Sequence, residues 1–174
     1  MTITPTTGGP SEAVVQDFAD MSAVLTGFQS SFLRPFLDPT NLSFVFYNFA
    51  VAQPQVGQSM MDGLLSTFDS LKAQTPALTE QQIADRLLEV TKSPSNQAQL
   101  AQSIILMWYL GSWYPPAFQT QGEQQVISSQ AYTKSLVWNV AQAHPMGFSA
   151  FTFGYWAQPP GPLDQFGVNT GGGQ

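Results

Sequence analysis

The sequence predicts an all-α protein: a compact helical domain of about five to six helices with an extended arm at each end. Apolar residues recur at three- and four-residue spacing in successive stretches, most of which follow a residue able to cap a helix. The connections between these stretches are short and contain Pro, Gly or Asn. A length of 174 residues suits one domain. We therefore expect a mobile N-terminal arm over residues 1–10, a helical body over 11–141 and an extended C-terminal arm over 142–174.

The first helix has a clear start and a clear end in the sequence. Ser11 can cap its beginning, and Gly27 is a typical residue to end it. Between them, one apolar face recurs at helical spacing and consists of Val14, Val15, Phe18, Met21 and Leu25. We expect this face to be buried.

The second helix is expected to begin at Asp38, because the proline that follows suits the first helical position. Leu37 and Leu42 lie where a hydrophobic staple would close over that start. The stretch over 42–52 is rich in aromatic residues, and its alternation is also compatible with a strand. The helix is the favoured interpretation, and the strand is the alternative.

Four further helices follow. The apolar residues of 60–71 again fall at helical spacing. Thr79–Gln82 has the pattern of a capping box and begins the fourth helix. Ser95 can cap a fifth, and Ser128 or its neighbour a sixth that ends near Ala141.

Residues 142–174 show no helical period and are rich in proline and glycine. Disordered tails are usually poor in aromatic residues, but this segment contains Phe148, Phe151, Phe153, Tyr155, Trp156 and Phe166. An extended arm explains this combination better than a disordered tail. The arm packs either along its own helices or along a partner, and the sequence favours neither.

Composition excludes several classes of function. Charged residues make up 9% of the chain, against about 25% in a typical soluble domain. The net charge is −6, and the five basic residues form no cluster, so nucleic acid is not an expected partner. The chain has no cysteine, which excludes disulfides, thiolate zinc sites and iron–sulfur clusters. No apolar stretch has the roughly 18–20 residues of a membrane helix, so no membrane insertion is expected.

Residues that could carry catalysis are few. His144 is the only histidine and precedes a proline, which makes a structural role the commoner reading. Asp17 with Asp20, and Asp85 with Glu89, can share a helix face, but they fall on the polar sides of their helices. We expect no catalytic residue, bound cofactor or metal site in this chain.

The stretch from residue 107 to residue 160 is crowded with aromatic rings, and its only charged residues are Glu123 and Lys134. Exposed rings with little charge among them usually mark a contact with another molecule. Some of the rings must form core. The expected fold and interface anchors are Trp108, Tyr109, Trp113, Tyr114, Trp138, Phe153, Tyr155 and Trp156.

Several sequence patterns occur together in one order. They are Phe18–Gly27, Leu37–Pro39, Ile104–Gly111 with its Trp-Tyr-Leu-Gly end, Tyr132–Trp138, His144–Gly147 and Phe153–Pro160. In this order they resemble the small, cofactor-free subunit of bacterial FAD-dependent sugar and polyol dehydrogenases, the group that includes the sorbitol, fructose and glucose dehydrogenases. The resemblance covers residues 18–160.

The resemblance implies a partner role. In that family a glucose–methanol–choline-type subunit carries the FAD, a cytochrome c subunit often takes the electrons, and the small subunit stabilises the catalytic one and helps to export it. A periplasmic location follows, with the cytoplasm as the alternative, because residues 1–10 contain no twin-arginine leader. Lack of cysteine excludes a disulfide to the partner, so buried area must hold the pair together.

Two other classes of function remain open. One is a free-standing carbohydrate-binding module, in which Trp113, Tyr114 and Trp156 form a stacking platform. The other is an independent hydrolase that uses carboxylates and His144.

Overall fold

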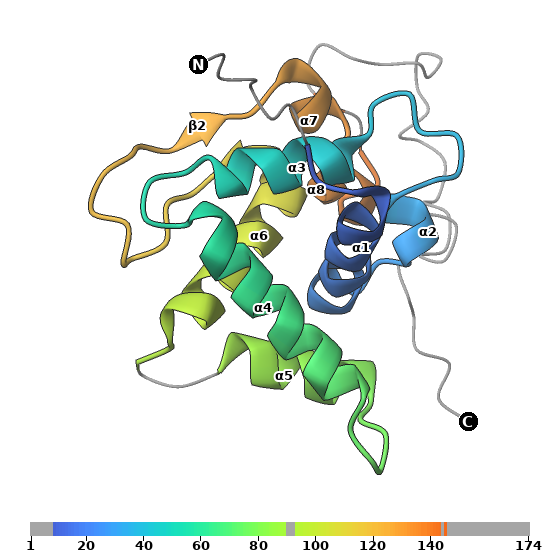
Figure 1. Ribbon diagram of the computed structural model, residues 1–174. Coiled ribbons are helices and arrows are strands. Elements are labelled where there is room, and N and C mark those ends of the chain that lie inside the picture. Colours follow the sequence, from blue (N-terminus) through green and yellow to red (C-terminus); the bar gives the residue numbers. More distant parts are fainter. Residues whose placement is uncertain (1–8, 90–92, 144, 146–174) are drawn as a thin grey trace, which may run out of the picture.

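A computed structural model describes residues 9–89, 93–143 and 145 of the chain. Its fold is all-α, as predicted (Figure 1). The longer helices are α1 (Glu12–Thr26), α3 (Leu42–Val51), α4 (Gly57–Lys72), α5 (Glu80–Leu88) and α6 (Asn96–Leu110), and the short ones are α2 (Ser30–Leu33), α7 (Ser129–Thr133) and α8 (Leu136–Val140). Strands β1 (Ser112–Trp113) and β2 (Gln125–Val126) form a small antiparallel pair. The predicted arms lie largely outside the described residues.

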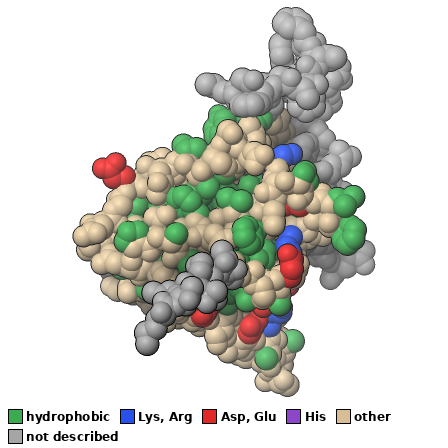
Figure 2. Space-filling view, turned by 45° about the horizontal axis from the view of Figure 1, so that its top comes forward, with side chains coloured by type: hydrophobic (Ala, Val, Ile, Leu, Met, Phe, Trp, Pro, Cys, Tyr) green, Lys and Arg blue, Asp and Glu red, His purple; other side chains and the backbone are tan. Residues whose placement is uncertain are grey.

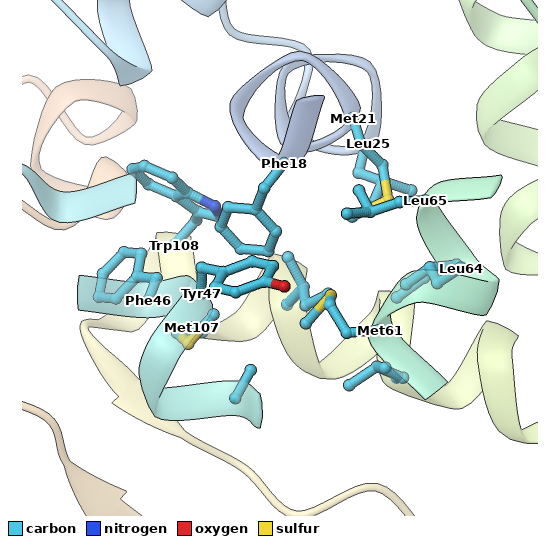
Figure 3. Close-up of a cluster of buried hydrophobic side chains, with 14 of the residues drawn as sticks. Phe18, Met21, Leu25, Phe46, Tyr47, Met61, Leu64, Leu65, Met107 and Trp108 are labelled. Atoms are coloured by element: carbon cyan, nitrogen blue, oxygen red, sulfur yellow. The ribbon is translucent and has the colours of Figure 1, made fainter. Parts of the chain in front are cut away.

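The core forms where α1, α3, α4 and α6 meet (Figure 3). Phe18 of α1 meets Tyr47 of α3 edge to face, with 5.7 Å between the ring centres. Phe46 packs on Trp108 of α6 in the same manner at 4.7 Å. Met61 contributes a fully buried side chain from α4. These contacts join helices that are far apart in sequence, so aromatic rings form the centre of the described core.

The helix-end residues predicted for α1, α5 and α6 are confirmed. Ser11 accepts a hydrogen bond from the Val14 N–H at the start of α1, and Gly27 ends that helix in a left-handed conformation. Thr79 forms the expected capping box at α5, and Ser95 caps α6. Each cap satisfies an N–H that the helix itself cannot bond.

Two predicted helix boundaries are wrong. The helix expected from Asp38 begins four residues later, at Leu42, and Leu37 is 84% exposed, so no hydrophobic staple forms. The stretch over 42–52 is helical, and the strand alternative is therefore also wrong. The final helix breaks into α7 and α8, because the Tyr132 carbonyl oxygen accepts hydrogen bonds from the Ser135 hydroxyl and the Trp138 indole. The chain therefore turns between α7 and α8.

The β1–β2 pair was not among the predicted elements, and it positions the end of the helical body. Gly111 ends α6 with φ +64° and lies directly against the backbone of Ala131 in α7. The chain leaves α6 through β1 and returns through the antiparallel β2, so that α7 and α8 lie beside α6. None of the described helices has both the length and the apolar character that would let it cross a membrane.

Candidate functional site: an apolar loop beside a groove

Residues 35–39, here called the Phe36 loop, connect α2 to α3 and stand away from the helices (Figure 1). Phe36 is completely exposed, and Leu37 is 84% exposed. A proline at each end of the loop restricts its backbone and removes two hydrogen-bond donors. Two large apolar side chains therefore project into solvent on a stiffened segment.

The base of this loop is fixed on both sides. Leu33 of α2 is buried, and the next residue, Arg34, donates a 2.6 Å hydrogen bond to Gln16 of α1 and pairs with Glu12. On the other side, Asp38 accepts hydrogen bonds from the Thr40 N–H at 2.9 Å and the Thr40 hydroxyl at 2.6 Å. The loop is therefore held at both ends while its tip is free of contacts that would bury Phe36.

Asp38 acts as a surrogate cap for α3. Partial burial alone would raise the pKa of its carboxyl group, but hydrogen bonds from the Thr40 side chain and from the backbone of Thr40, Asn41 and Leu42 lower the pKa below its usual value. Asn41, the residue before α3, has φ +44° and makes no side-chain cap. The carboxylate therefore serves the helix start from four residues upstream.

A groove of about 670 Å³ runs beside the Phe36 loop. One wall comes from α2, the loop and the start of α3, and the other comes from α7 and α8. Its lining residues are Ser31, Phe32, Leu33, Pro35, Leu37, Asp38, Pro39, Thr40, Leu42, Trp108, Thr133, Lys134, Leu136, Trp138, Asn139, Ala143 and Pro145. The groove is mainly apolar, and among the described residues that line it only Asp38 and Lys134 are charged.

Trp138 is the aromatic residue of the α8 wall. Its ring meets that of Tyr132 edge to face at 5.5 Å, and its indole N–H donates to the Tyr132 carbonyl oxygen at 2.9 Å. These two contacts fix the half-buried ring in one orientation. Trp138 thus offers a rigid apolar surface to the groove, and its role as an interface anchor stays a prediction.

Two predicted interface anchors lie in the core instead. Trp108 is 2% exposed and Trp113 is fully buried, with Trp113 near Phe49. They are core residues because α6 ends with Trp108 facing α3, and β1 then turns Trp113 inward. Neither indole offers a surface that a partner could cover, and Trp113 is unable to join a sugar-stacking platform.

The remaining predicted anchors divide into two groups. Tyr109 is half-buried and donates a 3.0 Å hydrogen bond to the Thr26 carbonyl oxygen; its burial raises the pKa of its hydroxyl group. Tyr114 is half-buried as well, and its hydroxyl oxygen accepts from Gln124. The other three anchors, together with His144, lie outside the described residues: Phe153, Tyr155 and Trp156.

The carboxylates considered for catalysis make local contacts. Asp20 accepts from Gln16, Asp85 accepts from Gln81, and Glu89 accepts from the N–H and hydroxyl of Ser95. Among the described residues, no three His, Cys, Asp or Glu side chains come together as metal ligands would.

Charge is sparse over the face of the molecule in Figure 2, where hydrophobic side chains are scattered among uncharged polar ones.

The sequence-based prediction missed Phe36 as a functional candidate, because all the predicted anchors lie after residue 107. The signal was nevertheless present: Phe36 and Leu37 lie between two prolines and belong to no helical period. Residues outside a helical period do not belong to an apolar helix face, so helix packing does not bury them.

Comparison of the chain with protein-family models, with curated proteins and with solved structures returns no match.

Proposed function

We propose that this chain is the non-catalytic small subunit of an FAD-dependent sugar or polyol dehydrogenase, and that it docks onto the FAD-bearing subunit through the Phe36 loop. The observation that carries the proposal is the complete exposure of Phe36 on a loop fixed at both ends. A large ring held in solvent costs free energy in the isolated chain. That cost is offset when the ring enters a pocket of another protein.

Magnitudes support an anchor role for this loop. Burying a Phe or Leu side chain stabilises by about 1.5–3 kcal/mol each relative to leaving it exposed. Phe36 and Leu37 together would therefore supply a few kcal/mol at one point of the interface. A fixed loop loses little conformational entropy on docking, so more of this gain appears as affinity.

The patterns that carry the family resemblance also gather around this site. Leu37–Pro39 forms part of the loop, and Trp108 and Trp138 belong to two further patterns and line the adjacent groove. These segments are about a hundred residues apart at their extremes. Their convergence supports a shared role in shaping the part of the fold that carries the Phe36 loop: Trp108 is 2% exposed and acts from the core, and the loop itself meets the flavoprotein.

The proposal assigns the chemistry to the complex. FAD is bound by the glucose–methanol–choline-type partner, a cytochrome c subunit accepts the electrons, and the complex works in the periplasm. The present chain contributes surface, and its low charge reduces the desolvation penalty of covering that surface.

The test is co-expression with a flavoprotein of this type encoded in the same genome, followed by affinity capture and native mass spectrometry. Phe36→Ser should lower the captured flavoprotein at least tenfold. Phe44→Ser is the matched control, because Phe44 is 37% exposed and lies outside both loop and groove; it should leave capture unchanged. Equal capture by the two variants would contradict docking through the loop. Saturable sugar binding by the isolated chain would favour the carbohydrate-binding alternative.

A further inference from the structure

The groove lies where the chain leaves the described fold. Pro145 lines the groove and is the last described residue, and residues 146–174 follow it. Whatever occupies the groove must therefore compete with a segment that is covalently attached at its rim. For a short flexible connection, the effective concentration of such a segment is in the millimolar range. The attached segment consequently has an advantage over any free molecule.

The sequence that follows matches the groove in chemical character. Phe151, Phe153 and Tyr155 alternate with Thr152 and Gly154. In an extended chain, alternate side chains point to opposite sides, so these three rings would share one face. This pattern suits a chain laid along an apolar surface, and it is unsuited to a helix.

Length and charge also agree. An extended chain spans at most about 3.3–3.6 Å per residue, so residue 155 can lie up to roughly 35 Å from Pro145. The segment is therefore long enough for residues 151–155 to lie beside the part of the groove that Pro145 lines. Asp164 is the only charged residue in 146–174, and the described lining of the groove contributes only Asp38 and Lys134. Occupation of the groove therefore desolvates almost no charge.

We propose that residues 151–155 of the chain's own C-terminal segment occupy the groove in an extended conformation, with their aromatic face against Trp138 and the opposite apolar wall. The sequence left two places for this segment, its own helices or a partner, and the proposal takes the first. The proposal concerns the chain alone, and it stands whether or not the Phe36 loop docks onto a flavoprotein. The groove is then an intramolecular seat, and Phe36 stays outside it.

Absence of cysteine makes the proposal directly testable in the full chain, because every thiol can be placed by design. Thr152→Cys puts a thiol between the rings and leaves all three in place. Leu37→Cys puts a second thiol on the far wall of the groove, at a position that is 84% exposed. A short bis-maleimide should cross-link this pair within one monomer.

Val140→Cys is the matched control. Val140 is 46% exposed, does not line the groove and lies only five residues before Pro145. An undocked segment would form the shorter loop, from 140 to 152, at least as readily as the longer one. Docking predicts the reverse: the 37–152 cross-link should exceed the 140–152 cross-link at least fivefold in the monomer band, measured by intact-mass spectrometry.

A second variant tests the anchor rings. Replacement of Phe151, Phe153 and Tyr155 by Ser in both cysteine pairs, 37–152 and 140–152, should abolish that fivefold preference. Circular dichroism confirms that each variant keeps its helices. Equal yields for the two pairs, or a preference that survives the triple replacement, would overturn the proposal. Cross-links found only between two molecules would also overturn it, and would assign the groove to a second copy.

Discussion

Gly111 separates two contributions to the stability of this fold, and Gly27 supplies the comparison. Both glycines end a helix with positive φ, at +64° and +77°. Replacement by alanine forces an L residue into the left-handed region at each position, which costs about 1–2 kcal/mol. A Cβ at Gly27 meets nothing within 4 Å. We therefore expect Gly27→Ala to lose only that backbone term.

At Gly111 a second cost is added. The new Cβ would lie 2.5 Å from the Ala131 carbonyl oxygen and 2.7 Å from the Tyr132 nitrogen. Both are backbone atoms, so no side chain can rotate away and α7 itself must shift. Overpacking of this kind typically costs a further 1–3 kcal/mol or so. The total for Gly111→Ala is then about 2–5 kcal/mol.

The assay is urea unfolding of the full chain, followed by far-ultraviolet circular dichroism. The slope should stay the same in all three proteins, so that midpoint differences report stability. Gly111→Ala should be less stable than Gly27→Ala by about 1–3 kcal/mol, the overpacking term alone. Equal losses for the two variants would refute the close approach of α7 to the end of α6, and with it the placement of the groove's α7–α8 wall.

Two further variants test the site. Trp113→Ala should destabilise the chain by about 3–5 kcal/mol in urea unfolding, because it empties a fully buried indole site; a surface platform residue would cost almost nothing. Asp38→Ala should cost about 1 kcal/mol at neutral pH, as the loss of a cap does. Because the pKa of Asp38 is lowered in the fold, its contribution is present above the ordinary carboxyl pKa and is lost as pH falls through the folded value. The difference between wild type and Asp38→Ala should therefore shrink toward zero in strong acid, and a constant difference would contradict the assigned hydrogen bonds.

Helix caps could be predicted from the sequence because their physics is local. Ser11, Thr79 and Ser95 each bond an N–H three residues away, and no distant part of the chain is needed. Gly27 is equally local, since only its own backbone conformation matters. These four residues fix the ends of three helices without reference to the tertiary structure.

The start of α3 and the break between α7 and α8 depend on side-chain hydrogen bonds that helix periodicity and capping patterns do not reveal. Asp38 looked like the cap of an immediate helix, but its carboxylate bonds Thr40 and delays the helix to Leu42. Likewise, the periodicity of 129–141 allowed one helix. In the fold the Trp138 indole N–H donates a hydrogen bond to the Tyr132 carbonyl oxygen, which fixes the indole while the helix is interrupted between α7 and α8. Both departures shape the groove, which explains why the groove was absent from the sequence-based picture.

The crowding of aromatic residues after 107 was a weaker argument for a companion protein than the sequence indicated. Trp108 and Trp113 are enclosed by the chain's own helices, and Trp138 is half-covered. The case for a partner therefore moves to Phe36, which lies outside that stretch and is the one large apolar side chain with full exposure among the described residues. The low charge of the chain also favours contact with a partner. Amides and hydroxyls lose less hydration energy than ions when a partner covers them, so the surface around Phe36 can add buried area to the few kcal/mol that the loop supplies.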